Sequence, residues 1–268
     1  MRTIGDSSGR WGPIRWRRVW WTVTAAAAVI VGIITVQKLA YAVAYLDPGI
    51  DYETVMRGAR GWLSGDGFYP ADQLTGAWVY HQGEPAFLPP ILYPPDALLL
   101  FVPFTYLPAF LWWAVPIGFT SWALVQLQPH PAAWLGIILL LGLPESREPI
   151  FWGNPVIWAV AAEAGGFLYG WPGVLVLIKP TLAPFALAGA PSRSWLIALG
   201  ALVLVNLALL PMWFQWVTVI QGSSLSADYS FSQYPLMAIP LVAWLAGDRR
   251  RRRSGRAWVR APEGRSSN

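Results

Sequence analysis

Asp51 is a candidate general base, because it stands immediately before a segment with the periodicity of an amphipathic helix. A carboxylate fixed at such a point could accept a proton from a hydroxyl group. The same residue could serve as a helix N-cap, whose side chain accepts hydrogen bonds from the first turn. The two roles are compatible, since a catalytic base must itself be held in position. Asp47 lies close by but does not begin the helix.

Glu163 and Lys179 are also of interest, because each interrupts an otherwise apolar stretch. An ionisable residue inside a membrane span is a functional candidate by default. The two residues lie seven positions before and nine positions after Gly170. If the chain turns there, each lies roughly 10–14 Å deep at a helical rise of about 1.5 Å per residue. The alternative is an ion pair in which the two residues simply neutralise each other.

The segments that carry these residues have the composition of a membrane protein. Of the 268 residues, 55% are hydrophobic and 12% are charged, whereas a soluble domain carries roughly a quarter charged residues. The run 19–46 exceeds the roughly 20 apolar residues of a helical span and is too long for a signal peptide. The 18 Trp and 24 Pro also fit this class. We expect an all-α integral membrane protein, a polytopic helix bundle.

Two topologies accommodate the apolar segments. These segments lie near residues 19–46, 92–108, 109–127, 131–144, 155–170, 171–190, 195–212 and 232–247. In the first topology all eight cross the membrane. In the second, the proline-rich segments 92–108 and 171–190 are half-membrane hairpins, which leaves six spans and implies a cavity, because such backbone must be shielded from lipid. Only the second topology puts the loop 145–155 outside, beside the first exterior loop.

Arginine clusters at both ends predict the orientation. Arg15, Arg17 and Arg18 precede the first apolar segment, and an arginine run at 249–253 follows the last. By the positive-inside rule both termini are cytoplasmic, so 47–91 is the first exterior loop. The expected parts are a cytoplasmic basic segment 1–18, a polytopic domain 19–247 and a disordered cytoplasmic tail 248–268. This placement of the net charge of +5 favours membrane lipids over nucleic acid as partners.

The first exterior loop holds the most informative segment. Its apolar residues recur at helical spacing: Tyr52, Val55, Met56, Ala59, Trp62 and Leu63. The opposite face carries Glu53, Arg57, Arg60 and Ser64. Gly65 is placed to end the helix. Because the helix follows a span directly, we expect it to lie along the membrane surface.

Four segments occur in an order that is found in one enzyme family. They are Asp51 to Tyr69, which ends in Ser-Gly-Asp-Gly-Phe-Tyr; Tyr93-Pro94-Pro95 with Leu107-Pro108; Gly153-Asn154; and Lys179-Pro180. Together, over about residues 20–190, they resemble the family-87 glycosyltransferases, bacterial enzymes of the GT-C class that include polyprenol-phosphate-mannose-dependent mannosyltransferases. The resemblance implies a GT-C-like fold with the broken-helix topology, in the bacterial plasma membrane. The chain departs from the family in lacking several C-terminal spans.

The resemblance also implies a reaction and a site. A mannose-like sugar would pass from a polyprenyl phosphate to a lipid or glycan hydroxyl on the exterior face, with inversion and with Asp51 as the base. Cations must stabilise the departing phosphate, and the candidates are Arg147, Lys179, Arg57 and Arg60. Further substrate-binding candidates are Asn154, Tyr93 and His81.

Several candidates have a simpler explanation. Arg57 and Arg60 could be a solvated helix face, and Arg147 could pair locally with Glu145 or Glu148. His81 stands alone in a Pro/Gly-rich loop and could be structural or solvated, and His130 lies between two prolines in a turn. With no Cys and no His or carboxylate cluster at metal-ligand spacing, we expect no metal or other cofactor, although a divalent-ion requirement stays open.

Two other functions remain possible from the sequence. Broken helices and intramembrane ionisable residues also suit a transporter or flippase for a lipid or small solute. The short length suits a non-catalytic membrane subunit that assembles with a partner protein. The long first loop with its surface helix, and the absence of an evident inverted repeat, favour the glycosyltransferase over the transporter.

Overall fold

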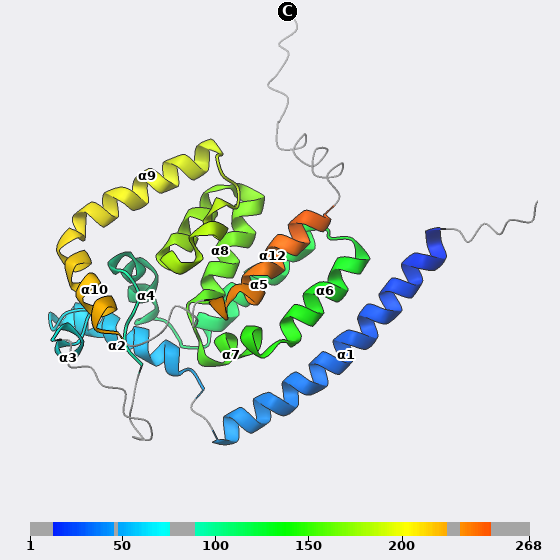
Figure 1. The fold of residues 1–268 in the computed structure, drawn as a ribbon, viewed down its shortest axis with the longest axis horizontal. Coiled ribbons are helices and arrows are strands. Elements are labelled where there is room, and N and C mark those ends of the chain that lie inside the picture. The colour runs from blue at the N-terminus through cyan, green and yellow to red at the C-terminus, as the bar shows by residue number, and fades with distance from the viewer. Residues whose placement is uncertain (1–12, 46–47, 76–88, 224–230, 248–268) are drawn as a thin grey trace, which may run out of the picture.

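The computed structural model of the chain describes residues 13–45, 48–75, 89–223 and 231–247 (Figure 1). Within these ranges the secondary structure is helical without any strand, and an isolated β-bridge joins Pro129 to Gly247. The all-α class predicted from the sequence is therefore confirmed. The helices are α1 (Pro13–Tyr45), α2 (Ile50–Ser64), α3 (Ala71–Leu74), η1 (Pro95–Ala97), α4 (Leu98–Phe104), α5 (Leu111–Leu127), α6 (Pro131–Gly142), α7 (Pro144–Trp152), α8 (Val156–Tyr169), η2 (Trp171–Ile178), η3 (Pro180–Leu187), α9 (Arg193–Ala208), α10 (Leu210–Gly222) and α12 (Tyr234–Ala246).

Helix α1 stands at the edge of the bundle, where it packs on α6 (Figure 1). Its apolar side chains are largely exposed, as in Val29 at 61% and Val36 at 66%. Within the described residues, 18–41 is the one stretch long and apolar enough to cross a membrane unaided. Helices α9 and α10 meet this test only as a pair, across a bend of 83°.

The remaining apolar helices are 10–17 residues long, shorter than the segments counted in the sequence. Prolines and glycines account for the difference, because they interrupt helical hydrogen bonding. Segment 92–108 becomes η1 followed by the seven-residue α4, and segment 171–190 becomes the two 3₁₀ helices η2 and η3.

The two 3₁₀ helices form a hairpin against α8. Gly170 and Gly189 adopt positive φ angles of 84° and 80° at the open end of this hairpin, and Lys179 forms its tip. The two arms of the hairpin pack closely on each other: a Cβ atom added at Gly173 would lie 2.1 Å from the carbonyl oxygen of Ala188, at the end of η3. The sequence thus brings Lys179 back along α8 toward the start of that helix.

The described chain begins and ends on the same side of the bundle, away from α2 (Figure 1). Helix α7 lies on the α2 side, where the Gly49 N–H donates to the Phe151 carbonyl at 3.2 Å. Loop 145–155 is therefore next to the first loop, which is the arrangement expected in the six-span alternative. Tryptophans at the start of α5 fix this loop further, since Trp112 donates to the Gly153 carbonyl and Trp113 to the Ile150 carbonyl, both at 2.7 Å.

Candidate functional site

Asp51 lies in the first turn of α2 rather than before it. The helix begins at Ile50, and Gly49 occupies the N-cap position with φ 83°, a conformation that favours glycine. The predicted N-cap role of Asp51 is therefore wrong, because the chain turns into the helix earlier than the apolar pattern indicated. The carboxylate instead accepts a hydrogen bond from Asn154, with Oδ2 and Nδ2 2.7 Å apart. A carboxylate in the first turn also interacts favourably with the helix dipole.

The apolar face predicted for α2 is found over most of the helix. Tyr52, Val55, Met56 and Ala59 are buried, and Gly65 ends the helix at φ 89°. The last two residues of the predicted face differ, because Trp62 and Leu63 are 41% and 42% exposed.

Asn154 connects three parts of the site. Its Oδ1 accepts from the Val156 N–H at 3.0 Å and from Lys179 Nζ at 3.2 Å. Both partners can only donate, so the remaining amide nitrogen must be the atom that faces Asp51. Asn154 thus begins α8, receives the ammonium group and donates to the carboxylate. The motif Gly153-Asn154 fits this role, since Gly153 ends α7 at φ 69°.

Lys179 lies on the Asp51 side of the molecule and not beside Glu163. Its Nζ atom lies 5.4 Å from the centroid of the Tyr93 ring, within cation–π distance. The predicted pairing with Glu163 is wrong, because the chain after Gly170 is a 3₁₀ helix. A 3₁₀ rise of about 2.0 Å per residue carries the tip roughly a third deeper than an α-helix would.

A cavity of about 840 Å³ opens beside these residues, and we call it the Asp51 cavity. Its polar lining includes Asp51, Asn154, Lys179, Glu145, Glu148 and Gln233. Tyr93, Trp152 and Trp216 add aromatic surface. The volume suits a ligand of sugar or nucleotide size.

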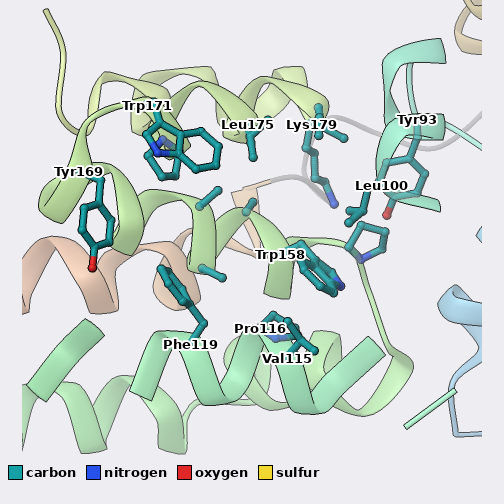
Figure 2. Close-up of a pocket in the computed structure, with 16 residues that line it drawn as sticks. Tyr93, Leu100, Val115, Pro116, Phe119, Trp158, Tyr169, Trp171, Leu175 and Lys179 are labelled. Carbon is teal, nitrogen blue, oxygen red and sulfur yellow. The ribbon is translucent and has the colours of Figure 1, made fainter. Parts of the chain in front are cut away.

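A second cavity of about 460 Å³ adjoins the first, because Tyr93 and Lys179 line both. We call it the apolar groove. Figure 2 shows that it runs from Tyr93 and Lys179 at one end to Tyr169 and Trp171 at the other. Its sides come from α5, α8 and η2, and nearly all of its lining is apolar. The Nε1 atom of Trp158, which also lines the groove, is buried without a hydrogen-bond partner among the described residues.

Two aromatic residues, the buried Tyr69 and the partly buried Trp216, hold the Tyr93 segment in place. The Tyr69 hydroxyl donates to the Tyr93 carbonyl at 2.7 Å, and Trp216 Nε1 donates to the Leu92 carbonyl at 3.0 Å. Burial raises the pKa of the Tyr69 phenol, so this group stays a neutral donor. The sequence motif that ends in Phe68-Tyr69 therefore supports the wall of the site.

Arg57 and Arg60 do not reach the Asp51 cavity. Both are on the exposed face of α2, where Arg60 lies 3.9 Å from Glu53 and Arg57 donates to the Pro89 carbonyl at 3.4 Å. Partial burial lowers the pKa of the Arg57 guanidinium, and the charge of Asp72 offsets this in part. Both residues therefore fit the simpler explanation, in which they form a solvated helix face.

Arg147 lies on α7 but does not line the cavity, unlike its neighbours Glu145 and Glu148. Its Nε donates to the Leu143 carbonyl at 3.4 Å, and the alternative of a local ion pair with Glu145 or Glu148 is not found among the described residues. His130 is the N-cap of α6 and not only a turn residue, since its Nδ1 accepts from the Ala132 N–H in the first turn of that helix. His81 and Asp47 lie outside the described residues.

Gln233 is a site residue that the sequence reasoning missed. It is fully buried, and its two amide atoms have no hydrogen-bond partner in the described parts of the chain. It lines the Asp51 cavity just before the last apolar helix. Its position at the exterior end of the predicted span 232–247 is the feature of the sequence that could have identified it as a candidate.

No group of three or more His, Cys, Asp or Glu side chains within the described ranges is arranged to hold a metal ion. Comparison with protein-family models, with curated proteins and with solved structures gave no match to this chain.

Proposed function

We propose that the chain is a membrane glycosyltransferase that moves a sugar from a polyprenyl phosphate to an acceptor hydroxyl. One observation carries the proposal. A carboxylate and an ammonium group are held on either side of Asn154, where a polar cavity meets an apolar groove. Such a junction suits a substrate with a sugar, a phosphate and a long hydrocarbon chain.

The reaction assigns a role to each side chain. The acceptor oxygen attacks the anomeric carbon, the bond from that carbon to the phosphate oxygen breaks, and the polyprenyl phosphate leaves. Asp51 takes the hydroxyl proton. Lys179 stabilises the charge that develops on the phosphate. Glu145, Glu148 and Gln233 line the same cavity and could bind sugar hydroxyl groups.

The hydrocarbon chain of the donor would lie in the apolar groove. The groove begins at Lys179, so a phosphate at this residue directs its chain between α5, α8 and η2 (Figure 2). The buried N–H of Trp158 lies along this path and could donate to an oxygen near the phosphate.

Exposed apolar surface supports a position within a bilayer. On α9, Ile197 and Leu204 are 65% and 69% exposed, and α1 presents apolar residues on all sides. Soluble proteins rarely expose apolar patches of this extent. We propose six spans, formed by α1, α5, α6, α8, α9 and α12, with two re-entrant segments. Both termini would be cytoplasmic and the Asp51 cavity exterior.

The test measures transfer of labelled mannose from a polyprenyl phosphate by membranes that contain the chain. Asp51→Asn should lower the transfer rate by about 10²–10⁴-fold. Lys179→Met should lower it by about 10²–10³-fold, because a charge-stabilising group is lost. Arg60→Gln, on the exposed face of α2, is the matched control and should leave the rate unchanged. Full activity in Asp51→Asn would overturn the proposal.

A further inference from the structure

The side of the bundle away from α2 holds another cavity, of about 830 Å³. We call it the Glu163 cavity. Its walls are the last two turns of α8, the end of η3 and the loop that follows, and the second half of α12. The residues that matter for its chemistry are Glu163, Phe167, Tyr169, Phe185, Ser192 and Trp244. None of them belongs to the Asp51 cavity.

Among the described residues, Glu163 is a buried acid without a charged partner. Its side chain is 1% exposed, and its Oε2 atom has no hydrogen-bond partner in the described part of the chain. The helices that surround it, α5, η2, η3 and α12, contain no charged residue and no histidine. The charged residues of α7 and the tip residue Lys179 lie at the other end of α8, and Arg193 at the start of α9 is exposed.

An unpaired carboxylate in such surroundings is costly, because burial in a medium of low polarity disfavours charge. Protonation of the acid avoids this cost when no positive group is beside it. A cation that enters the cavity pairs with the carboxylate and removes this cost.

The other lining residues identify which kind of cation fits. The Phe167 and Trp244 rings stack at 4.8 Å with an interplanar angle of 14°, and Phe185 and Tyr169 add further aromatic surface. Aromatic faces attract organic ammonium groups through cation–π interaction. A hard metal ion fits poorly, since Ca²⁺ takes about six to eight oxygen ligands and the lining side chains offer one carboxylate, the Ser192 hydroxyl and the Tyr169 phenol.

We propose that the Glu163 cavity is a separate site for an organic ammonium group, which binds between the carboxylate and the aromatic rings. The group could belong to a lipid headgroup or to a soluble amine. This site is separate from the Asp51 cavity, because it lies at the opposite end of α8 and shares no side chain with that cavity, although Tyr169 also lines the far end of the apolar groove.

The experiment uses the full chain in phosphatidylglycerol vesicles and dicyclohexylcarbodiimide, a probe that modifies neutral carboxylic acids in apolar surroundings. Mass spectrometry of the digested protein should find Glu163 modified and Glu53, on the exposed face of α2, unmodified. Choline at millimolar concentration should protect Glu163 if the site accepts soluble amines. Replacement of phosphatidylglycerol by phosphatidylethanolamine should protect it if the site accepts the lipid headgroup.

Direct binding of radiolabelled choline, or of phosphatidylethanolamine by mass spectrometry of the intact protein, gives a second readout. Glu163→Gln should lower the affinity at least about tenfold, because the ammonium group loses its counter-charge. Trp244→Leu should lower it by about two- to thirtyfold while the carboxylate remains. Glu53→Gln should bind as the wild type does. If neither amine source protects Glu163 and neither binds, the proposal is overturned.

Discussion

The amide of Asn154 sets the relation between the two charged groups of the Asp51 cavity. It donates to the carboxylate through Nδ2 and accepts from the ammonium through Oδ1, so one amide links the positions of both groups. In the proposed transfer Asn154 would be a positioning residue, and a displacement of about 1 Å at such a place can lower a rate about 10²-fold.

Asn154→Asp tests this role with little change in shape. Aspartate keeps an acceptor for the Val156 N–H and for Lys179, but it replaces the donor that faces Asp51 by a second carboxylate oxygen. Two adjacent carboxylates cannot both ionise easily, so the base stays protonated to higher pH. We expect transfer at neutral pH to fall about 10–100-fold and the acidic limb of the pH–rate profile to move to higher pH. A lower rate with an unmoved profile would show that the residue is only structural.

At the scale of the helices, the hairpin of η2 and η3 determines where Lys179 lies. The sequence predicted a chain reversal near Gly170, and the prolines of segment 171–190 indicated broken helix. The depth predicted for the lysine assumed an α-helical rise and was too small, because an apolar run has the same pattern in an α-helix and in a 3₁₀ helix. The start of α2 was misplaced for a similar reason, since periodicity cannot distinguish Gly49 from Asp51 as the cap.

Gly173 tests whether the close packing of this hairpin is required. A Cβ atom there would lie 2.1 Å from the Ala188 carbonyl oxygen, whereas one at Gly200 on α9 would meet nothing within 4 Å. We expect Gly173→Ala to destabilise the protein by about 1–3 kcal/mol or more through overpacking. Gly200→Ala should be neutral or slightly stabilising, because alanine favours helix. Thermal unfolding in detergent measures both, and equal melting temperatures would contradict the packing described here.

At the scale of the whole molecule, the fold brings together residues that no local pattern relates. Asp51 and Asn154 are 103 positions apart in the chain and form a hydrogen bond. Two topologies fit the sequence, and only the six-span one placed these residues on one side. Gln233 joins the same cavity from the start of α12, a contact that follows from the packing of α12 on α8 and η3 rather than from its own residue type. The order of the motifs along the chain indicated which residues were candidates for the site, and the packing of the helices determined which of them share one cavity.

The topology itself can be tested directly, because the chain contains no cysteine and each introduced cysteine is unique. Ser64 and Arg193 are exposed controls, since both topologies put Ser64 outside and Arg193 inside. Glu148 and Tyr169 discriminate: the six-span topology puts Glu148 outside and Tyr169 inside, and the eight-span topology reverses both. We expect an impermeant maleimide to label Ser64→Cys and Glu148→Cys in intact cells, and Tyr169→Cys and Arg193→Cys only after permeabilisation.

Labelling of Tyr169→Cys in intact cells, with Glu148→Cys protected, would put Glu148 and the rest of the loop 145–155 in the cytoplasm. An exterior sugar transfer at Asp51 would then be incompatible with the contact between Asp51 and Asn154, because the two residues would lie on opposite sides of the membrane.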